Sequence, residues 1–247
     1  MHWVDDGIFL GGRKFGESSS IVSILTRQNG RHLGLVQGGI GRRLRPVLQV
    51  GNFLRCEWNA RLEENLGKFR LEMLKPLAAC VLEQPVQLSG MGSVCGLVEQ
   101  LLPERDRCTS LFEQTKDLLE NFVSGQNYMG KYVFWELDFL AELGFGLNLD
   151  SCVVTGVTND LSWVSPKSGC AVSKEAGAEY AKNLLVLPAF MINGSSGTTS
   201  EIVDGLKLTG YFLNKVANNN GIQLSSARSR FVDKVSREFY DHKSGNR

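Results

Sequence analysis

The sequence predicts an α+β protein in which a small β-barrel precedes a helical domain. Residues 1–80 contain five short apolar runs separated by turn signals, whereas the apolar residues after Pro85 recur at helical spacing. Pro76 and Pro85 bracket the change of pattern, because proline interrupts regular elements. We therefore expect one domain over residues 1–80 and a second, all-helical domain over residues 81–247, which contains an irregular, degenerate zinc-finger-like loop at residues 150–173.

The expected strands of the first domain are too short and too few to form two packed sheets. They cover residues 7–12, 19–26, 31–37, 53–58 and 68–74, and Gly30 offers the positive φ that a tight hairpin requires. Five such strands can close into a small barrel, as in the OB-fold. From these residues alone, an SH3-like barrel suits the pattern nearly as well.

The second domain shows the spacing of amphipathic helices. The first two expected helices, 94–102 and 111–122, end at Pro103 and Gly125. A third, 128–143, ends at Gly144 and Gly146. Further helices are expected over residues 173–176, 201–216 and 225–240, and the polar stretch 191–200 is expected to be a mobile surface loop.

The bulk composition is that of a globular protein. The chain has 247 residues, of which 43% are hydrophobic and 21% are charged. No apolar run approaches the roughly 18 residues that a membrane span needs. The N-terminus carries Asp5 and Asp6 where a signal peptide carries basic residues, so we expect a cytoplasmic protein without membrane contact. Its six cysteines stand mostly in apolar contexts and are expected to be reduced thiols.

The net charge of +1 hides an uneven distribution along the chain. Residues 1–80 hold 12 lysines and arginines against 7 acidic residues, a balance of +5, whereas residues 81–145 hold 4 against 10, a balance of −6. The remaining residues, 146–247, hold 11 against 9. A cationic barrel joined to an anionic helical unit is typical of a nucleic-acid-binding module attached to a part with another task.

The segment 38–46, GGIGRRLRP, is the best candidate for contact with DNA. Arg42, Arg43 and Arg45 follow glycines that let the backbone bend and approach a partner, so we expect a pliable loop that binds phosphates. The alternative is a solvated loop whose arginines only aid solubility.

Neighbouring turns and strand ends extend this basic character. Arg13, Lys14 and Arg31 are further candidates for phosphate contact. Phe15 lies in a polar turn and is the aromatic residue most suited to stack on a base, whereas most aromatic residues of a barrel belong to its core.

The cysteine loop has the spacing of a paired CxxC zinc site with two ligands replaced. Cys152 is followed three residues later by Thr155, and Cys170 is followed three residues later by Ser173. Hydroxyl groups are poor zinc ligands, so we expect no metal. The loop is instead expected to be held by a small apolar cluster: Val154, Leu161, Trp163, Val164 and Val172.

Recognised catalytic motifs do not occur in the sequence. There is no P-loop, no G-x-S-x-G elbow and no H-E-x-x-H motif, and a single Gly90-Met91-Gly92 is a weak match to a dinucleotide fingerprint. We therefore expect a binding protein rather than an enzyme, with no catalytic residues and no cofactor.

Three segments resemble the RecO family of recombination mediators. The first is the N-terminal stretch, in which Arg13, Gly16 and Glu17 form the family's turn before the hairpin at Gly30. The second is the helical run YVFWELDFLAELGFGLNL, which begins at Tyr132, and the third is the cysteine loop. The resemblance implies an OB-fold barrel, and it implies a zinc site only for those members that carry four cysteines.

The resemblance also implies a function. A RecO-like protein would bind and anneal single-stranded DNA, also contact double-stranded DNA, and help to load the recombinase RecA onto strands coated with single-stranded DNA-binding protein SSB, in association with the nucleoid. Its implied partners are RecR, the acidic C-terminal tail of SSB, and RecF and RecA. The available cations for an acidic tail in the helical domain are Arg105, Arg107, Lys116 and Lys131. The alternative is an OB-containing assembly factor that docks an acidic protein and does not bind DNA.

Overall fold

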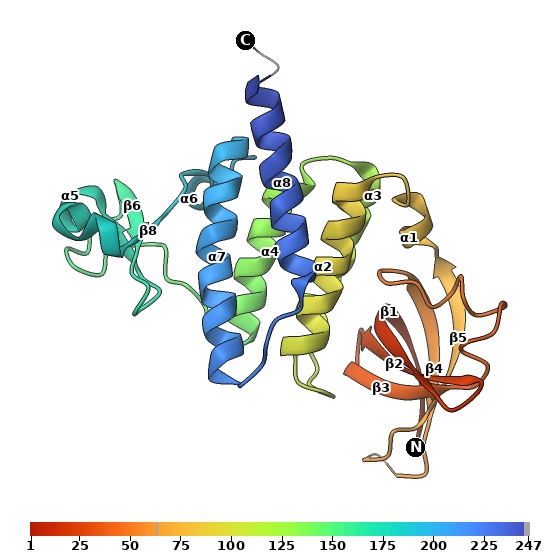
Figure 1. Ribbon diagram of the computed structural model, residues 1–247. Helices are drawn as coiled ribbons and strands as arrows, with labels where there is room; N and C mark the ends of the chain where they lie inside the picture. Colours follow the sequence, from red (N-terminus) through yellow and green to blue (C-terminus); the bar gives the residue numbers. More distant parts are fainter. Residues whose placement is uncertain (63, 245–247) are drawn as a thin grey trace. The chain divides into compact units, whose positions relative to one another are not determined.

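The computed structural model describes residues 1–62 and 64–244 and divides into two compact units. The first comprises Met1–Gln126 with Ser225–Phe231, and the second comprises Asn127–Leu224 with Val232–Arg247. Each unit is described by itself below, and Figure 1 labels the elements of both.

The first unit contains a closed barrel with the strand order β1-β2-β3-β5-β4. Strand β1 is long enough to pair antiparallel with both β2 and β4, and the barrel closes through a parallel pairing of β3 with β5 at Leu35 and Lys68. This is the five-stranded OB-fold, so the predicted fold is confirmed. The strands are β1 (His2–Phe15), β2 (Ser19–Thr26), β3 (Gly30–Val36), β4 (Phe53–Asn59) and β5 (Lys68–Lys75).

Every second side chain along the strands points inward, and these side chains fill the barrel. Inward-facing residues of all five strands form one buried cluster, which includes Phe9, Val22, Leu54, Trp58 and Phe69. A Cβ atom on Gly34 would lie 2.3 Å from the Phe69 ring, so glycine is needed on β3 for this ring to fit. The prediction that most barrel aromatics belong to the core is confirmed.

Three helices follow the barrel in the first unit: α1 (Leu77–Cys80), α2 (Pro85–Leu101) and α3 (Thr109–Ser124). Pro85 occupies the first turn of α2, where its missing N–H costs no hydrogen bond. Helix α3 ends at Gly125, which takes the left-handed conformation at φ +71°. Both predicted helices of this region are confirmed, although α2 begins nine residues earlier than its apolar periodicity indicated.

The second unit is built around α4 (Tyr128–Glu142) and α7 (Thr199–Asn219), which pack against each other. Helix α7 begins with a capping box between Thr198 and Glu201. Helix α8 (Ser226–Ser244) begins in the first unit and continues in the second. None of the helices in the described ranges is long and apolar enough to cross a membrane.

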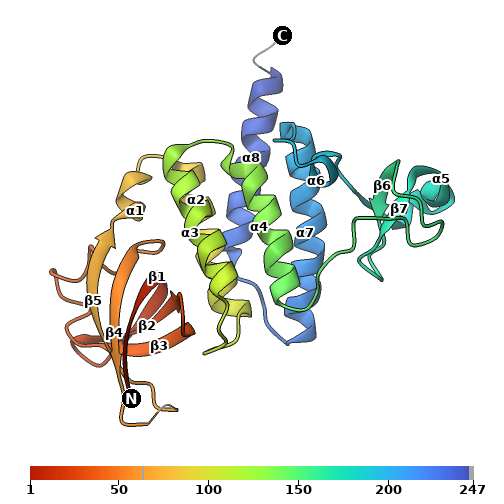
Figure 2. The ribbon, with the colours of Figure 1, turned by 180° about the vertical axis from the view of Figure 1, so that it is seen from behind.

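A small sheet accompanies these helices, and its elements are visible from behind in Figure 2. Its strand order is β7-β6-β8, and short helical segments flank it. The elements are β6 (Leu161–Val164), β7 (Ala171–Ser173), α5 (Lys174–Gly177), η1 (Ala178–Asn183), β8 (Leu185–Val186) and α6 (Phe190–Asn193). The predicted short helix is confirmed as α5, with the Ser173 hydroxyl accepting from the amide of Ala176.

Three local expectations for this region need correction. The segment 150–173 is not wholly irregular, because it contributes β6 and β7, and strands of three or four residues are too short to give a periodic signal. Residues 191–193 belong to α6 rather than to a surface loop, and Met191 is buried. Of the expected apolar cluster, Leu161, Val164 and Val172 are buried, but Val154 is 69% exposed and takes no part.

Candidate nucleic-acid interface

The β3–β4 loop, residues 37–52, carries the three arginines on an ordered framework. Successive backbone hydrogen bonds form tight turns, among them the amide of Gly41 to the Gly38 carbonyl at 2.8 Å and the amide of Leu48 to the Leu44 carbonyl at 2.9 Å. Leu44 and Val47 pack on the barrel core. These turns and the packing of Leu44 and Val47 hold the loop against the barrel, and its pliability stays a prediction.

Arg42, Arg43 and Arg45 are all exposed, but they lie on two different sides of the loop. Arg43 lines a groove along β5, whereas Arg42 and Arg45 line an apolar pocket. Within the described residues none of the three forms an ion pair, so their guanidinium groups remain available to a ligand.

The groove along β5 consists of two adjoining cavities of about 820 and 430 Å³. We call it the β5 groove and define it by its charged residues: Arg43, Arg55, Glu57, Lys68, Arg70 and Glu72. The strand register sets these charges side by side, because Arg55 pairs with Glu72 and Glu57 pairs with Arg70 across β4 and β5.

Two of these groove residues already have hydrogen-bond partners within the barrel. Arg55 donates to Asp6 at 2.7 Å, and Glu57 accepts from His2 at 3.2 Å. Arg43, Lys68 and Arg70 form no ion pair in the part of the chain that the structure describes. The β5 groove therefore offers three cations without an ion pair in that part of the chain, and sequence spacing did not bring Arg43 together with Lys68 and Arg70. The sequence analysis missed Arg55, Lys68 and Arg70, and their alternation with buried residues in strands was the available signal.

The apolar pocket has a volume of about 570 Å³, and the β3–β4 loop forms one of its walls. Its wall is aliphatic, and Arg42 and Arg45 are its charged residues. Asn52 helps to shape it: its side-chain amide donates to the Pro46 carbonyl at 2.9 Å and accepts from the Ala78 amide at 3.1 Å. The remaining wall includes Met73, Pro76, Ala79, Leu82 and Leu88.

The end of β1 presents three of the other predicted DNA contacts. Arg13, Lys14 and Phe15 are exposed beside the β1–β2 turn, and Phe15 is 50% exposed. Their exposure suits contact with a ligand. Trp3 is a half-buried aromatic residue that the sequence analysis did not consider, and it stacks on Trp58 with ring centroids 5.5 Å apart.

Arg31 has a structural role. Its Nε donates to the Leu102 carbonyl at 2.8 Å, and its guanidinium lies 3.7 Å from the Glu104 carboxylate. Burial lowers the pKa of Arg31, while the charges of Glu104 and Glu99 oppose that shift. Arg31 ties the end of α2 to the barrel and is not presented to solvent as Arg13 is.

Three of the four cations expected to bind an acidic tail already have partners, and the fourth belongs to the other unit. Arg105 donates to the Asn65 carbonyl at 3.1 Å, and Arg107 donates to the Gln28 side chain, so both fasten the α2–α3 connection to barrel turns. Lys116 pairs with Glu113 on α3, and Lys131 lies on α4 in the other unit. In contrast, Arg42 and Arg45 do lie beside an apolar pocket.

The cysteine loop gathers hydroxyl and amide donors around one thiol. Cys152 is buried, and its Sγ accepts from the Ser173 amide at 3.2 Å. Burial raises the pKa of this thiol, but hydrogen bonds from Ser173 and Thr155 outweigh it and lower the pKa to about 6. No group of three or more metal-ligating side chains occurs in the described ranges. Thr155 and Ser173 thus act as hydrogen-bond donors to Cys152 at the positions where a zinc site would carry cysteines.

Comparison with known proteins assigns both parts of the chain. The family model "Recombination protein O N terminal" matches residues 1–77, and "Recombination protein O C terminal" matches residues 82–219. Similar proteins include the DNA repair protein RecO of Rhodospirillum centenum, 43% identical over 95% of this chain and 94% of that protein. The RecO proteins of Bradyrhizobium diazoefficiens and Rhodospirillum rubrum are 45% and 40% identical, each over 96% of this chain and 96% and 97% of their own lengths. The chain therefore belongs to the RecO family of DNA repair and recombination proteins.

Proposed function

We propose that the barrel binds single-stranded DNA along the β5 groove and that the protein anneals complementary strands as a non-enzymatic recombination mediator. Arg43, Lys68 and Arg70 contact phosphates in the groove, with Arg42 and Arg45 on the adjoining loop. Arg13, Lys14 and Phe15 extend the surface at the end of β1. Double-stranded DNA binds through the same phosphate contacts, because these contacts carry no base sequence information.

The observation that carries this proposal is that Arg43, Lys68 and Arg70 line one groove of an OB-fold and form no ion pair among the described residues. Phosphate binding releases counterions, which supplies a favourable free energy that depends on salt. Two strands neutralised on one cationic surface repel each other less, and base pairing then drives annealing. No nucleotide hydrolysis is required for such a step.

We further propose that the protein acts with recombination partners. These are RecR, the acidic C-terminal tail of SSB, RecF and RecA, so that the protein helps to load RecA onto SSB-coated strands. An acidic tail needs cations beside an apolar surface. The apolar pocket with Arg42 and Arg45 fits this requirement better than Arg105 and Arg107, which already donate to barrel turns.

The apolar pocket also supports a second candidate function, an assembly factor that docks an acidic protein without binding DNA. Its aliphatic wall lacks the aromatic rings on which bases stack, and its two arginines suit carboxylates. The two functions differ in one measurable property, the affinity for DNA.

Fluorescence anisotropy with a labelled single strand across a salt series tests the main proposal. We expect binding at low salt, and a steep fall in affinity as salt increases. The triple variant Arg42→Ala, Arg43→Ala and Arg45→Ala should weaken binding to all sequences about equally. Absence of binding at low salt, or affinity independent of salt, would refute the mediator function and favour the assembly factor.

A control variant with the same net charge shows whether the loss of DNA affinity depends on where the arginines lie or only on the net charge of the protein. Lys174, Lys182 and Lys207 are exposed and belong to the second unit, whereas the barrel belongs to the first. Their replacement by alanine removes three positive charges, as many as the triple arginine variant removes. We expect this control to bind nearly as tightly as the parent, whereas equal losses in both triple variants would show that the β3–β4 loop is not the binding surface.

A further inference from the structure

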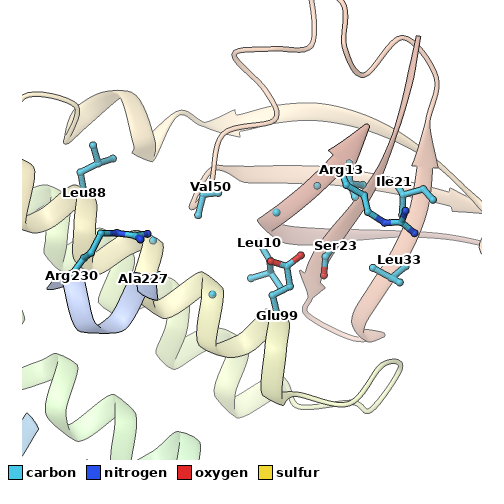
Figure 3. Close-up of a pocket in the computed structure, with 15 residues that line it drawn as sticks. Leu10, Arg13, Ile21, Ser23, Leu33, Val50, Leu88, Glu99, Ala227 and Arg230 are labelled. Atoms are coloured by element: carbon cyan, nitrogen blue, oxygen red, sulfur yellow. The ribbon is translucent and has the colours of Figure 1, made fainter. Parts of the chain in front are cut away.

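A separate cavity of about 600 Å³ lies between the outer face of the barrel and helix α2. We call it the β1–α2 pocket. Figure 3 shows Leu10, Ser23 and Leu33 on the barrel side and Leu88 and Glu99 on α2. The start of α8 contributes Ala227 and Arg230, and all lining residues belong to the first unit.

The sequence of α2 keeps this pocket open. Gly92 and Gly96 both line it, because residues four apart share one face of a helix. A Cβ atom on Gly92 would contact nothing within 4 Å. Glycine inside a helix costs about 1 kcal/mol relative to alanine, so α2 keeps a costly residue at a position where a larger side chain would fit.

Two polar groups converge in the middle of the pocket. Ser23 is only 1% exposed, and its hydroxyl oxygen has no hydrogen-bond partner among the described residues. The Glu99 carboxylate lies next to it in Figure 3, close against the backbone of Gly11. Burial raises the pKa of Glu99, and the charge of Arg31 opposes that shift. A buried hydroxyl without a partner is costly and indicates a group that a ligand satisfies.

Cations lie at both ends of this polar centre. Arg13 on β1 and Arg230 on α8 both line the pocket; in Figure 3 the Arg230 side chain extends toward the barrel, and the Arg13 guanidinium lies beside Ile21 and Leu33. Both are exposed, and Arg230 also donates to the Ser226 hydroxyl. The pocket therefore combines aliphatic walls, an acceptor and a hydroxyl at its centre, and positive charge at its two ends.

We propose that the β1–α2 pocket holds one nucleotide of a bound single strand, with an amino-bearing base between the aliphatic walls. Glu99 accepts a hydrogen bond from the amino group, Ser23 bonds the base edge, and Arg13 and Arg230 contact the flanking phosphates. This inference rests on the proposed DNA binding and gives it a base preference. An acidic peptide suits the pocket less well, because Glu99 would repel its carboxylates, and a purely apolar ligand would leave Glu99 and Ser23 unsatisfied.

The chemistry of Glu99 predicts which base is preferred. A carboxylate accepts from the cytosine amino group, whereas uracil carries a carbonyl oxygen at the same position. Deoxycytidine and deoxyuridine oligomers of equal length are therefore matched probes for anisotropy at one fixed salt concentration. We expect the cytosine oligomer to bind at least about tenfold more tightly, the lower end of what one hydrogen bond to a charged group contributes.

Three variants test the origin of this preference. Glu99→Gln should abolish most of it, because glutamine can donate to uracil as well as accept from cytosine. Gly92→Leu should also abolish it by filling the pocket. Gly92→Ala is its matched control and should retain the preference, since it adds one methyl group and improves helix propensity in the same way.

Thermal unfolding shows whether Gly92→Leu loses the base preference because its pocket is filled or because its fold is damaged. Gly92→Leu and Gly92→Ala should both unfold at or above the temperature of the parent. Cytosine and uracil oligomers that bind equally to the parent, or a preference that survives both Glu99→Gln and Gly92→Leu, would overturn this inference while leaving the proposed function intact. No binding of either oligomer at low salt would overturn both.

Discussion

Gly30 lies so close to the backbone of Asp106 that a Cβ atom on residue 30 would be 2.0 Å from the Asp106 carbonyl oxygen. The contact joins the β2–β3 turn to the connection between α2 and α3. The Arg105 amide donates to the Arg31 carbonyl at 2.8 Å in the same place, and the Thr109 hydroxyl donates to the Arg27 carbonyl at 3.0 Å. Gly30 thus serves both the hairpin, at φ +68°, and the packing of the helical connection on the barrel.

Gly30→Ala should destabilise the protein much more than Gly16→Ala. Both glycines have positive φ, at +68° and +65°, so both alanine variants suffer a backbone cost of about 1 kcal/mol. A Cβ atom on Gly16 contacts nothing within 4 Å, whereas one on Gly30 collides with backbone that cannot rotate away. We expect Gly30→Ala to cost about 3 kcal/mol or more in urea unfolding. Equal losses in the two variants would show that the contact with Asp106 yields easily.

The barrel should become less stable when the pH drops below about 6.5, because of His32. Burial lowers the pKa of His32, the charges of Arg105 and Arg31 add to that shift and Asp5 opposes it, and together they bring the pKa to about 4. Between pH 6.5 and pH 4, His32 is therefore protonated in the unfolded chain but not in the folded protein. The contribution of His32 to the free energy of unfolding is constant above pH 7. It falls by about 2 kcal/mol as the pH decreases towards 4, after allowance for solvent screening.

His32→Phe is the variant that isolates this effect. The ring of His32 stacks on Trp58 with centroids 5.3 Å apart, and phenylalanine keeps an aromatic ring there without a titrating group. Unfolding free energies of the parent and the variant should be compared at several pH values from 4 to 8. The difference should shift in favour of the variant as pH falls, and a difference that is constant across this range would contradict the buried state of His32.

A buried carboxylate lies between the two main helices of the second unit. The Thr209 hydroxyl on α7 donates to Glu136 on α4, and both side chains are fully buried. Glu136→Ala should cost about 2 to 4 kcal/mol, because it removes packing and an acceptor from a buried donor. Glu136→Gln keeps the shape and an acceptor oxygen, so its loss should be smaller.

Glu142→Ala provides the control for helix α4, because Glu142 is exposed near the end of the same helix. We expect a change within about 0.5 kcal/mol, as for other surface positions. Chemical denaturation of the three variants gives the ranking directly. A loss for Glu136→Ala no larger than that for Glu142→Ala would show that the buried pair contributes nothing to stability.

Much of the barrel could be predicted from the sequence because its signals are local. Alternating apolar residues and the turn at Gly30 mark β2 and β3 to within one or two residues. The full length of β1 could not be predicted, because Asp5 and Asp6 resemble solvent-exposed residues. Asp5 is in fact buried, where it accepts from the amide of Gln28 at 2.7 Å and from the side chain of Asn29 at 2.8 Å.

The candidate site was only partly predictable, since its residues meet through strand register and tertiary packing. Arg43 was evident in a glycine-rich segment, but Lys68 and Arg70 join it only because β5 runs beside the β3–β4 loop. Arg31 reads as an exposed cation in the sequence, yet its partner, the Leu102 carbonyl, lies at the end of a helix in a later segment. Sequence charge alone does not distinguish a cation that binds a ligand from one that fastens two elements together.

The three arginines of the β3–β4 loop should differ in their effect on DNA affinity. Arg43 lies in the β5 groove with Lys68 and Arg70, whereas Arg45 lies over the apolar pocket. A strand that follows the groove contacts Arg43 directly, so Arg43→Ala should reduce the slope of log affinity against log salt by about 0.7, the value for one phosphate contact on a single strand. Arg45→Ala should change the slope less, and Lys174→Ala in the second unit serves as the control for loss of one charge. If Arg45→Ala reduced the slope as much as Arg43→Ala, the strand would cross the loop rather than follow β5, because only a crossing path brings both guanidinium groups to phosphates.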